Sequence, residues 1–327
     1  MNFFIASALL NAFVAGLLGL IVILKNRKDI INRLFFLITI SIIVWALGYW
    51  QWMSSMGQSD PAKALFWARI LSIGSLFIPV FYFHWILAFV KLNKQKSNLI
   101  KIVYIIALIF LLFSFSELFV KEVSHKSIFP FWPTAGPLYS IYLIFIYFGL
   151  VAYSLITLWK QQKINTDSNK RSSIKYIILG TIIAFGGGAT NFPLWYGVPI
   201  LPYGNILVSI YPIVFTIAIA RYQLFNIRVI ATELLTFAIW IFVLVRLLLA
   251  DNIQERLING GLLLFLIISG ILLVRSVLKV EELGKAKSEF VTIASHQLRA
   301  SITAIKGYSS MVLEGTYGEV SDLYYLK

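Results

Sequence analysis

Residues 3–33 read FFIASALLNAFVAGLLGLIVILKNRKDIINR, an apolar run that ends in a basic segment. Apolar runs of roughly 17–25 residues are long enough to cross a bilayer as helices. This run lacks the basic start and the small-residue cleavage site of a signal peptide, so we expect it to be a retained transmembrane helix.

The same alternation of apolar runs and short polar loops continues through the chain. The 327 residues are 59% hydrophobic and only 13% charged, whereas soluble domains carry roughly a quarter charged residues. The absence of cysteine excludes disulfides, thiolate catalysis and cysteine-ligated metals, and no metal site is predicted. We therefore expect an all-α polytopic membrane protein with about nine transmembrane helices, at residues 3–24, 34–53, 64–90, 102–119, 138–159, 176–196, 204–220, 234–250 and 260–278.

Basic residues are concentrated in alternate loops. The loops 25–33, 91–101 and 160–175 carry four, four and five Lys or Arg, and the loops 54–63, 120–137 and 197–203 carry one, two and none. The positive-inside rule places the N-terminus outside, and nine crossings place the C-terminus in the cytoplasm. Because the net charge of +14 lies in these clusters, we expect a plasma-membrane protein in contact with lipid and no nucleic-acid binding.

Aromatic residues follow the predicted outer boundary of the membrane. Trp and Tyr gather at this interface because their rings are apolar and carry one polar atom. The predicted outer loops are short, so we expect a stimulus to act on the helices, on their outer rim or through the lipid. The predicted belt consists of Tyr49, Trp50, Trp52, Trp67, Phe131, Trp132, Trp195, Tyr196 and Tyr203.

Polar side chains inside apolar runs are costly and invite functional interpretations. Arg69 either extends to the outer headgroups or takes part in sensing. His84 is interpreted first as a hydrogen-bonded packing residue and second as a ligand-binding residue. Glu117 stands near the outer end of its run, where water reaches it.

The stretch GGGATNFPLWYG, residues 186–197, combines small residues with Asn191 and Pro193. Small residues let helices approach closely, and proline releases a carbonyl that must find another partner. With Pro212 in the next run, this corner is a candidate for a ligand pocket or a hinge, and close packing alone is the alternative.

The pattern changes after the ninth run. From residue 277 to residue 314 charges return, no proline occurs, and apolar residues recur at helical spacing. At 100° per residue His296 lies roughly opposite this apolar stripe, so the histidine faces water while the stripe faces a partner helix. The geometry suits a phosphoacceptor, and an idle surface histidine is the alternative. The stripe consists of Leu283, Phe290, Ala294, Leu298, Ile305 and Val312.

The stretch SHQLRASITAIKGYSSMVLEG, residues 295–315, resembles the phosphoacceptor helix of sensor histidine kinases. Residues 220–230, ARYQLFNIRVI, are similar to the segment that closes the seven-helix sensor region of some bacterial histidine kinases. The resemblance implies a membrane sensor of a two-component system, in which His296 accepts a phosphoryl group. It also implies pairing with kinase subunits as a homodimer or heterodimer, and a response regulator as partner. The family pattern F-x-x-x-x-S-H-E/Q-L-R-T-P-L-T-x-I is matched at Phe290, Ser295, His296, Leu298, Arg299, Thr303 and Ile305.

Three positions depart from the family pattern. Gln297 stands where many members have an acid that polarises the histidine, and an amide is a poorer proton acceptor. Ala300 replaces the threonine or asparagine that positions water for dephosphorylation. Ser301 replaces the proline that bends the helix. These departures affect the groups for the phosphatase function more than the phosphoacceptor itself.

No ATP-binding motif follows the histidine within the 327 residues. We expect a chain cut within its phosphoacceptor domain, without a cofactor of its own, which receives phosphate only in trans from an intact kinase with ATP and magnesium. The predicted domains are a seven-helix sensor region (1–222), two further transmembrane helices with a signalling linker (223–280), and an incomplete phosphoacceptor domain (281–327).

Two other functions are weighed against this one. The first is a non-catalytic regulatory subunit that pairs with intact kinases through the apolar stripe. The second is a transporter or channel, for which the spans offer only scattered polar residues.

Overall fold

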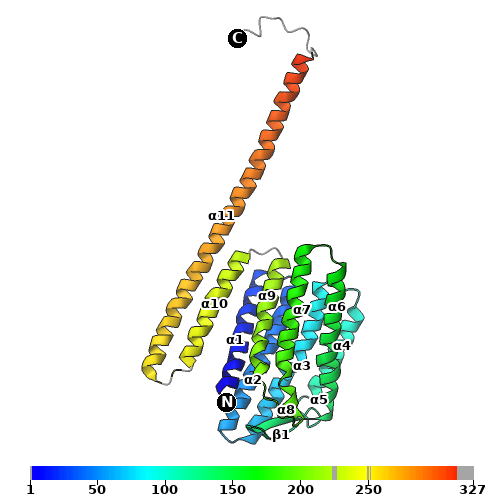
Figure 1. The fold of residues 1–327 in the computed structure, drawn as a ribbon, viewed down its shortest axis with the longest axis vertical. Coiled ribbons are helices and arrows are strands. Elements are labelled where there is room, and N and C mark those ends of the chain that lie inside the picture. Colours follow the sequence, from blue (N-terminus) through cyan, green and yellow to red (C-terminus); the bar gives the residue numbers. More distant parts are fainter. Residues whose placement is uncertain (1, 223–226, 249, 251, 315–327) are drawn as a thin grey trace. The chain divides into compact units, whose positions relative to one another are not determined.

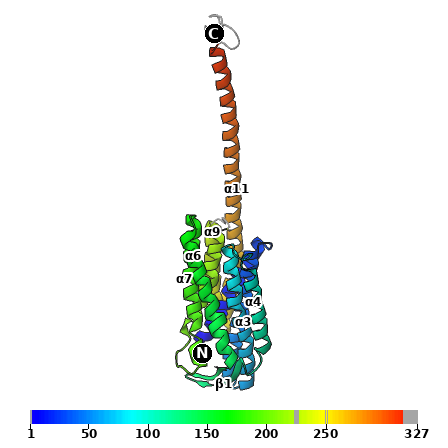
Figure 2. The same cartoon turned by 90° about the vertical axis from the view of Figure 1, so that its right-hand side faces the viewer.

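The computed structural model describes residues 2–222, 227–248, 250 and 252–314. Contacts divide the chain into two compact units, residues 1–266 and residues 267–327. The first unit is a bundle of helices that lie side by side (Figures 1 and 2). This division is one of contacts, and the predicted domain boundaries at 222/223 and 280/281 stay predictions.

Each predicted apolar run falls on helical structure. In the described ranges, six helical stretches are long and apolar enough to cross a membrane, and Ser97–Phe113 and Tyr203–Ala218 are shorter apolar helices. The protein is therefore a helical membrane protein, while nine crossings stay a prediction. The elements are α1 (Asn2–Lys25), α2 (Ile30–Gly57), α3 (Pro61–Phe89), α4 (Ser97–Phe113), α5 (Pro137–Ile141), a π-helix η1 (Tyr142–Gly149), α6 (Leu150–Ile164), α7 (Ser168–Ala189), α8 (Phe192–Trp195), a 3₁₀-helix η2 (Tyr203–Ser209), α9 (Ile210–Tyr222), α10 (Ile227–Leu248) and α11 (Ile253–Leu313).

Aspartates at the helix starts make the short turns possible. The side chain of Asp29 accepts hydrogen bonds from the backbone N–H groups of Ile31 and Asn32, at 2.7 and 3.3 Å. Asp60 likewise accepts from the N–H of Lys63 at 2.9 Å, and Pro61 occupies the first position of α3. Capping satisfies N–H groups that a helix start leaves without partners. The chain therefore reverses direction in a few residues at each of these points.

The mostly helical fold agrees with the predicted all-α class, and one loop departs from it by forming a two-stranded sheet. The predicted outer loop 120–137 contains an antiparallel hairpin of strand β1 (Val120–Lys126) and strand β2 (Phe129–Ala135), in which Ser124 lies opposite Trp132. The two strands are joined through Ser127, whose positive φ of 54° closes the tight turn. Pairing satisfies backbone groups in a segment whose two prolines do not suit a helix.

The fourth helix ends earlier than its apolar run. The run was expected to continue to residue 119, but α4 stops at Phe113 and turns lead into β1. Glu117 lies in these turns and is exposed, so this carboxylate is outside the helix and free to be hydrated.

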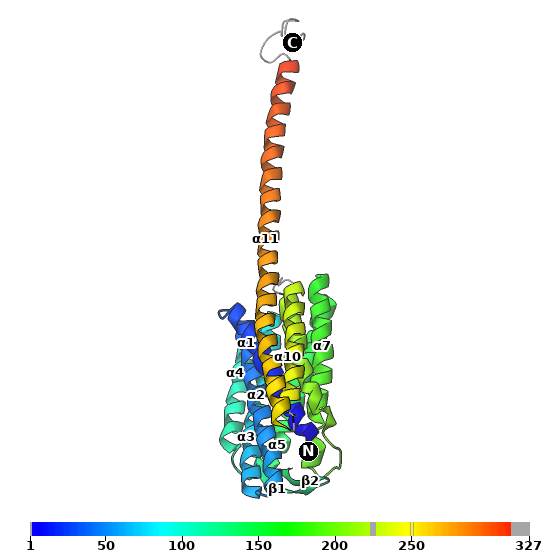
Figure 3. The same cartoon turned by 90° about the vertical axis from the view of Figure 1, so that its left-hand side faces the viewer.

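The hairpin, α8 and the start of α1 lie at one end of the first unit (Figures 1 and 3). The connection between α6 and α7 lies at the opposite end in Figure 1, and so does the connection between α1 and α2 in Figure 3. Both of these connections belong to the basic loops. The bundle therefore separates a basic end from an end that is closed by the hairpin.

Helix α11 continues without interruption from Ile253 to Leu313. It carries residues 295–313 of the stretch that resembles the phosphoacceptor helix of histidine kinases, called the H-box. Ser301 stands where the family pattern has a bend-forming proline. Its hydroxyl donates to the backbone carbonyl of Gln297 at 3.0 Å, and α11 continues without a break at this position. Residues 315–327 of the predicted phosphoacceptor domain lie outside the described residues, as do residues 223–226 of the segment 220–230.

Candidate functional site

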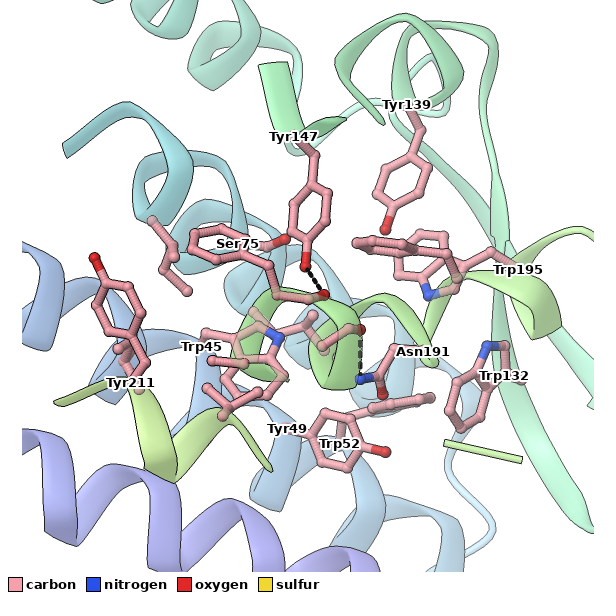
Figure 4. A pocket seen from close by; sticks show the side chains of 18 residues that line it. Trp45, Tyr49, Trp52, Ser75, Trp132, Tyr139, Tyr147, Asn191, Trp195 and Tyr211 are labelled. Carbon is pink, nitrogen blue, oxygen red and sulfur yellow. Dashed lines mark hydrogen bonds between the residues drawn. The ribbon is translucent and has the colours of Figure 1, made fainter. Parts of the chain in front are cut away.

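A cavity of about 60 Å³, measured as the space open to the centre of a water-sized sphere, lies inside the first unit. One water needs roughly 10–15 Å³ on this measure, so the cavity holds more than one water or part of a small organic molecule. Figure 4 shows the side chains around it. The lining residues come from α2, α3, β2, α5, η1, α7, α8, η2 and α9, and ten are aromatic: Trp45, Tyr49, Trp52, Trp132, Tyr139, Tyr147, Phe185, Phe192, Trp195 and Tyr211.

Helix α2 supplies one aromatic wall of this cavity. Trp45, Tyr49 and Trp52 follow one another at intervals of four and three residues, so they share one helix face. The ring of Tyr49 lies 5.8 Å from that of Trp45 and 5.1 Å from that of Trp52. Trp52 in turn packs edge-on against Trp132 of the hairpin at 4.6 Å. The wall therefore extends from the bundle into the hairpin.

The hairpin is attached to three helices at three points. The indole N–H of Trp52 donates to the carbonyl of Phe131 at 2.9 Å, and the guanidinium of Arg69 on α3 donates to the carbonyl of Val120 at 3.3 Å. The ammonium of Lys126 donates to the carbonyl of Trp195 in α8 at 2.9 Å and to that of Pro133 at 3.1 Å. These bonds fix the strand that carries Trp132 against the cavity.

Burial lowers the pKa of Lys126 below its usual value of 10.5, and the nearby carboxylate of Glu122 opposes this shift. The folded state therefore loses the lysine proton at lower pH than the unfolded chain. Between the lowered pKa and 10.5 the unfolded chain holds more protons, so the free energy of unfolding rises with pH in that window.

Replacing Lys126 with methionine is expected to remove this alkaline rise. Near neutral pH the variant also loses the hydrogen bonds to Trp195 and Pro133, at a cost of about 1 kcal/mol for a half-exposed group. The measurement is thermal unfolding of the detergent-solubilised protein from about pH 7 to about pH 10. Lys121→Met, an exposed lysine of the same strand, is the control. A Lys126→Met profile that rises like the wild-type profile would contradict this assignment.

Asn191 lies at the cavity wall and begins a chain of buried hydrogen bonds. Its amide nitrogen donates to the carbonyl of Gly188 at 3.0 Å and to the side-chain oxygen of Asn205 at 3.1 Å. The amide of Asn205 donates to the hydroxyl of Ser7 on α1 at 3.0 Å, and Asn11 donates to the carbonyl of Asn205 at 2.9 Å. The cavity wall is thus connected through side-chain amides to the first helix.

The π-helix η1 positions two tyrosines by hydrogen bonds to neighbouring helices. The hydroxyl of Tyr142 donates to the carbonyl of Ser75 at 2.8 Å, and that of Tyr147 donates to the carbonyl of Phe185 at 2.8 Å. One turn earlier, Tyr139 stacks on Trp195 with ring centroids 4.1 Å apart and planes 4° apart. Segments of π-helix are rare and often occur at functional sites.

The structure shows where the other polar residues of the predicted spans lie. Half-buried Arg69 contacts the hairpin, as described above. His84 makes a 2.9 Å hydrogen bond through Nδ1 with the hydroxyl of Tyr104 on α4, the contact expected of a packing residue. The structure does not bring Arg69, His84, Glu117 and Asn191 together in one site, and of the four only Asn191 lines the cavity.

In the stretch 186–197 the small residues pack closely and Asn191 lines a cavity, but Pro193 does not line it. A side chain on Gly187 would overlap the carbonyl of Gly204, so α7 and η2 approach closely there. Pro193 lies in the first turn of the separate helix α8, where the missing N–H costs little, and it does not line the cavity. The carbonyls at the end of α7 find partners, since Gly187 accepts from Thr190 and Gly188 accepts from Asn191.

Four members of the predicted aromatic belt face inward. Tyr49, Trp52, Trp132 and Trp195 are each at most 4% exposed and line the cavity, so their assignment to the lipid interface is wrong. Tyr196 and Tyr203 are exposed at the hairpin end and fit the belt. The spacing of Trp45, Tyr49 and Trp52 on one helix face was the sequence signal for this cavity.

His296 is exposed on α11, next to exposed Gln297 and Arg299. In the apolar stripe, Leu283, Phe290, Leu298 and Ile305 are exposed and Ala294 is half-buried. The side chain of Val312 lies outside the described residues. The histidine is therefore accessible, and the exposed stripe residues leave apolar surface for a partner.

Comparison with protein families matches residues 5–228 to the family described as the N-terminal 7TM region of histidine kinase. This match spans more than half of the 327 residues. The chain belongs to this family. Residues 5–228 extend from the first turn of α1 through α9, and this part of the chain is the membrane-embedded sensor region of a histidine kinase. Comparison with curated proteins and with solved structures gives no match.

Proposed function

We propose that this histidine-kinase-family protein is the membrane sensor of a two-component system and that His296 is its phosphoacceptor. The family match over residues 5–228 carries the proposal. The H-box resemblance and the exposure of His296 on α11 support the role of this residue, because ATP's γ-phosphate must reach an imidazole nitrogen. Gln297 occupies the position next to it where many kinases have an acid.

The proposed orientation has the N-terminus outside and His296 in the cytoplasm. Two of the three basic loops are seen at the end of the bundle opposite the hairpin, which the positive-inside rule assigns to the cytoplasm. The hairpin and the cavity then lie toward the outer face. A stimulus at that face would bias the bundle, and the last span, which is the first part of α11, would pass the change to the part of α11 that carries His296.

The proposed partners are kinase subunits and a response regulator. The exposed stripe on α11 supports pairing with a second helix of the same kind, because apolar stripes of this spacing pack in helical bundles. ATP and magnesium would be supplied by an intact kinase that acts in trans. The same stripe favours the alternative of a non-catalytic subunit, whose pairing with an intact kinase would not depend on His296.

The test is phosphate transfer to the chain in membranes. Membranes that contain the chain are incubated with an intact kinase of the family, radiolabelled ATP and magnesium. We expect acid-labile label on the chain, and mass spectrometry should place it at His296. Equal pairing with the kinase but no label would overturn the acceptor role and favour the non-catalytic subunit.

A further inference from the structure

Four buried polar atoms around the cavity have no hydrogen-bond partner within the part of the chain that the structure describes. They are the hydroxyls of Tyr49 and Tyr211, the indole N–H of Trp132 and the amide oxygen of Asn191. Each residue is at most 7% exposed. An unpaired buried group of this kind costs about 1–3 kcal/mol, so buried polar groups are normally paired. Four such groups at one cavity indicate that something else supplies their partners.

The charge of the cavity limits what that partner can be. No charged side chain is among the lining residues in the described ranges. The neighbouring cations, Lys126 and Arg69, donate to backbone carbonyls and do not line the cavity. An ion placed here would lose its hydration without gaining a counter-charge, which costs far more than burying a neutral polar group. The occupant is therefore uncharged.

The shape of the lining favours a flat occupant. Ring faces and edges dominate the walls, as in the parallel stack of Tyr139 on Trp195. In the view of Figure 4, Asn191, Trp132 and Trp195 lie on one side of the cavity and Tyr211 lies on the other. The side near Asn191 offers both a donor, Trp132 Nε1–H, and an acceptor, Asn191 Oδ1. A hydroxyl group is the smallest uncharged group that satisfies both.

We propose that this cavity binds an uncharged, flat, amphipathic small molecule. Its polar end carries a hydroxyl or similar group that accepts from Trp132 and donates to Asn191, and its rings pack among the aromatic side chains. The hydroxyl of Tyr49 makes a further contact with the polar end. The step from binding to signalling rests on the proposed function above, whereas the binding itself does not.

Such a ligand would contact both the hairpin and a hydrogen-bonded chain of residues that reaches α1. Trp132 belongs to the hairpin, and Asn191 is bonded to Asn205, whose amide reaches Ser7 on α1. Occupation would pair the free oxygen of Asn191 and hold the hairpin against the bundle. The ligand would then stabilise the arrangement of the bundle that makes these contacts relative to one that does not make them. A sensor requires such a difference.

The test uses three probes that share one ring system: 2-naphthol, 2-methoxynaphthalene and 2-naphthoate. Each is titrated by calorimetry into the full chain in lipid nanodiscs, and empty nanodiscs measure partition into lipid. We expect saturable binding of 2-naphthol. The methoxy probe, which has no hydrogen to donate, is expected to bind about tenfold more weakly, and tenfold corresponds to about 1.4 kcal/mol. The anionic probe should behave as it does with empty nanodiscs.

Two matched tyrosine variants separate binding from folding. Tyr49→Phe removes a hydroxyl that has no partner among the described residues, so thermal stability without probe should be unchanged or higher, while 2-naphthol affinity falls about three- to tenfold. Tyr142→Phe removes a bonded hydroxyl that does not line the cavity. This variant should lose stability and keep the wild-type affinity. Asn191→Leu should lower the affinity for 2-naphthol and not that for 2-methoxynaphthalene.

Two results would overturn the inference. One is a titration in which the heat released by 2-naphthol equals the heat released with empty nanodiscs. This result would mean that water alone fills the cavity. The other is wild-type 2-naphthol affinity in both Tyr49→Phe and Asn191→Leu, which would place the binding elsewhere. Because this assay does not read phosphate, probe binding without label at His296 would count against the proposed function alone.

Discussion

Phosphate transfer to the chain is expected to fall to background when His296 is replaced with alanine. Alanine has no nitrogen to attack the γ-phosphate, and the H-box resemblance offers no second acceptor on this helix. The variant should keep its fold, because His296 is an exposed position on α11 and alanine has the highest helix propensity. The measurement is acid-labile label from radiolabelled ATP in the membrane assay with an intact kinase.

The control is the same substitution at another exposed histidine. His125 lies on β1 and is exposed, so His125→Ala removes an accessible imidazole from the first unit and should leave the label unchanged. Circular dichroism of both variants should match that of the wild type. If label persists in His296→Ala and disappears in His125→Ala, the phosphoacceptor assignment is wrong.

The helices of this protein could be predicted because their signal is local. An apolar run of the required length forms a helix in a membrane, since every backbone group must find its partner within the segment. Asp29 and Asp60 then cap the helices that begin after short turns. Each predicted run therefore falls on helical structure, although three of the runs are divided into two or three helical segments and the helix ends differ by several residues.

The hairpin could not be predicted in the same way. Its stability comes from pairing between residues such as Ser124 and Trp132, and from the bonds that Trp52, Arg69 and Lys126 make with it. These partners are far apart in the sequence, and two prolines in β2 obscure the strand pattern. Nothing local distinguishes this segment from an irregular loop.

The cavity shows a further limit of sequence patterns. A tryptophan near the end of an apolar run is at the right depth for the lipid interface, but its direction around the helix depends on the neighbouring helices. Trp52 and Trp195 proved to face inward, while Tyr196 faces outward. Asn191 was recognised because an amide in a span is unusual, yet its cavity is completed by rings from five or more separate segments.

Replacing Gly74 with alanine is expected to destabilise the first unit strongly. A methyl group on Gly74 would overlap the backbone N–H of Trp45 and the carbonyl of Ser41, so α2 and α3 pack backbone against backbone there. Backbone atoms cannot rotate away as a flexible side chain can, and overpacking of this kind costs about 3 kcal/mol or more. We expect a lower unfolding temperature, measured by tryptophan fluorescence in detergent.

The substitution should also change the cavity. The added methyl group displaces Trp45, and Trp45 is part of the aromatic wall. Gly74→Ala should therefore weaken 2-naphthol binding even under conditions in which the variant is folded. Gly186→Ala on α7 is the matched control, since a methyl group there meets nothing within 4 Å. Alanine is the better helix former by roughly 0.5–1 kcal/mol, so this control should be neutral or slightly stabilising. Equal effects of the two substitutions would mean that α2 and α3 do not pack as closely as Gly74 requires, and the cavity wall built on that contact would have to be reconsidered.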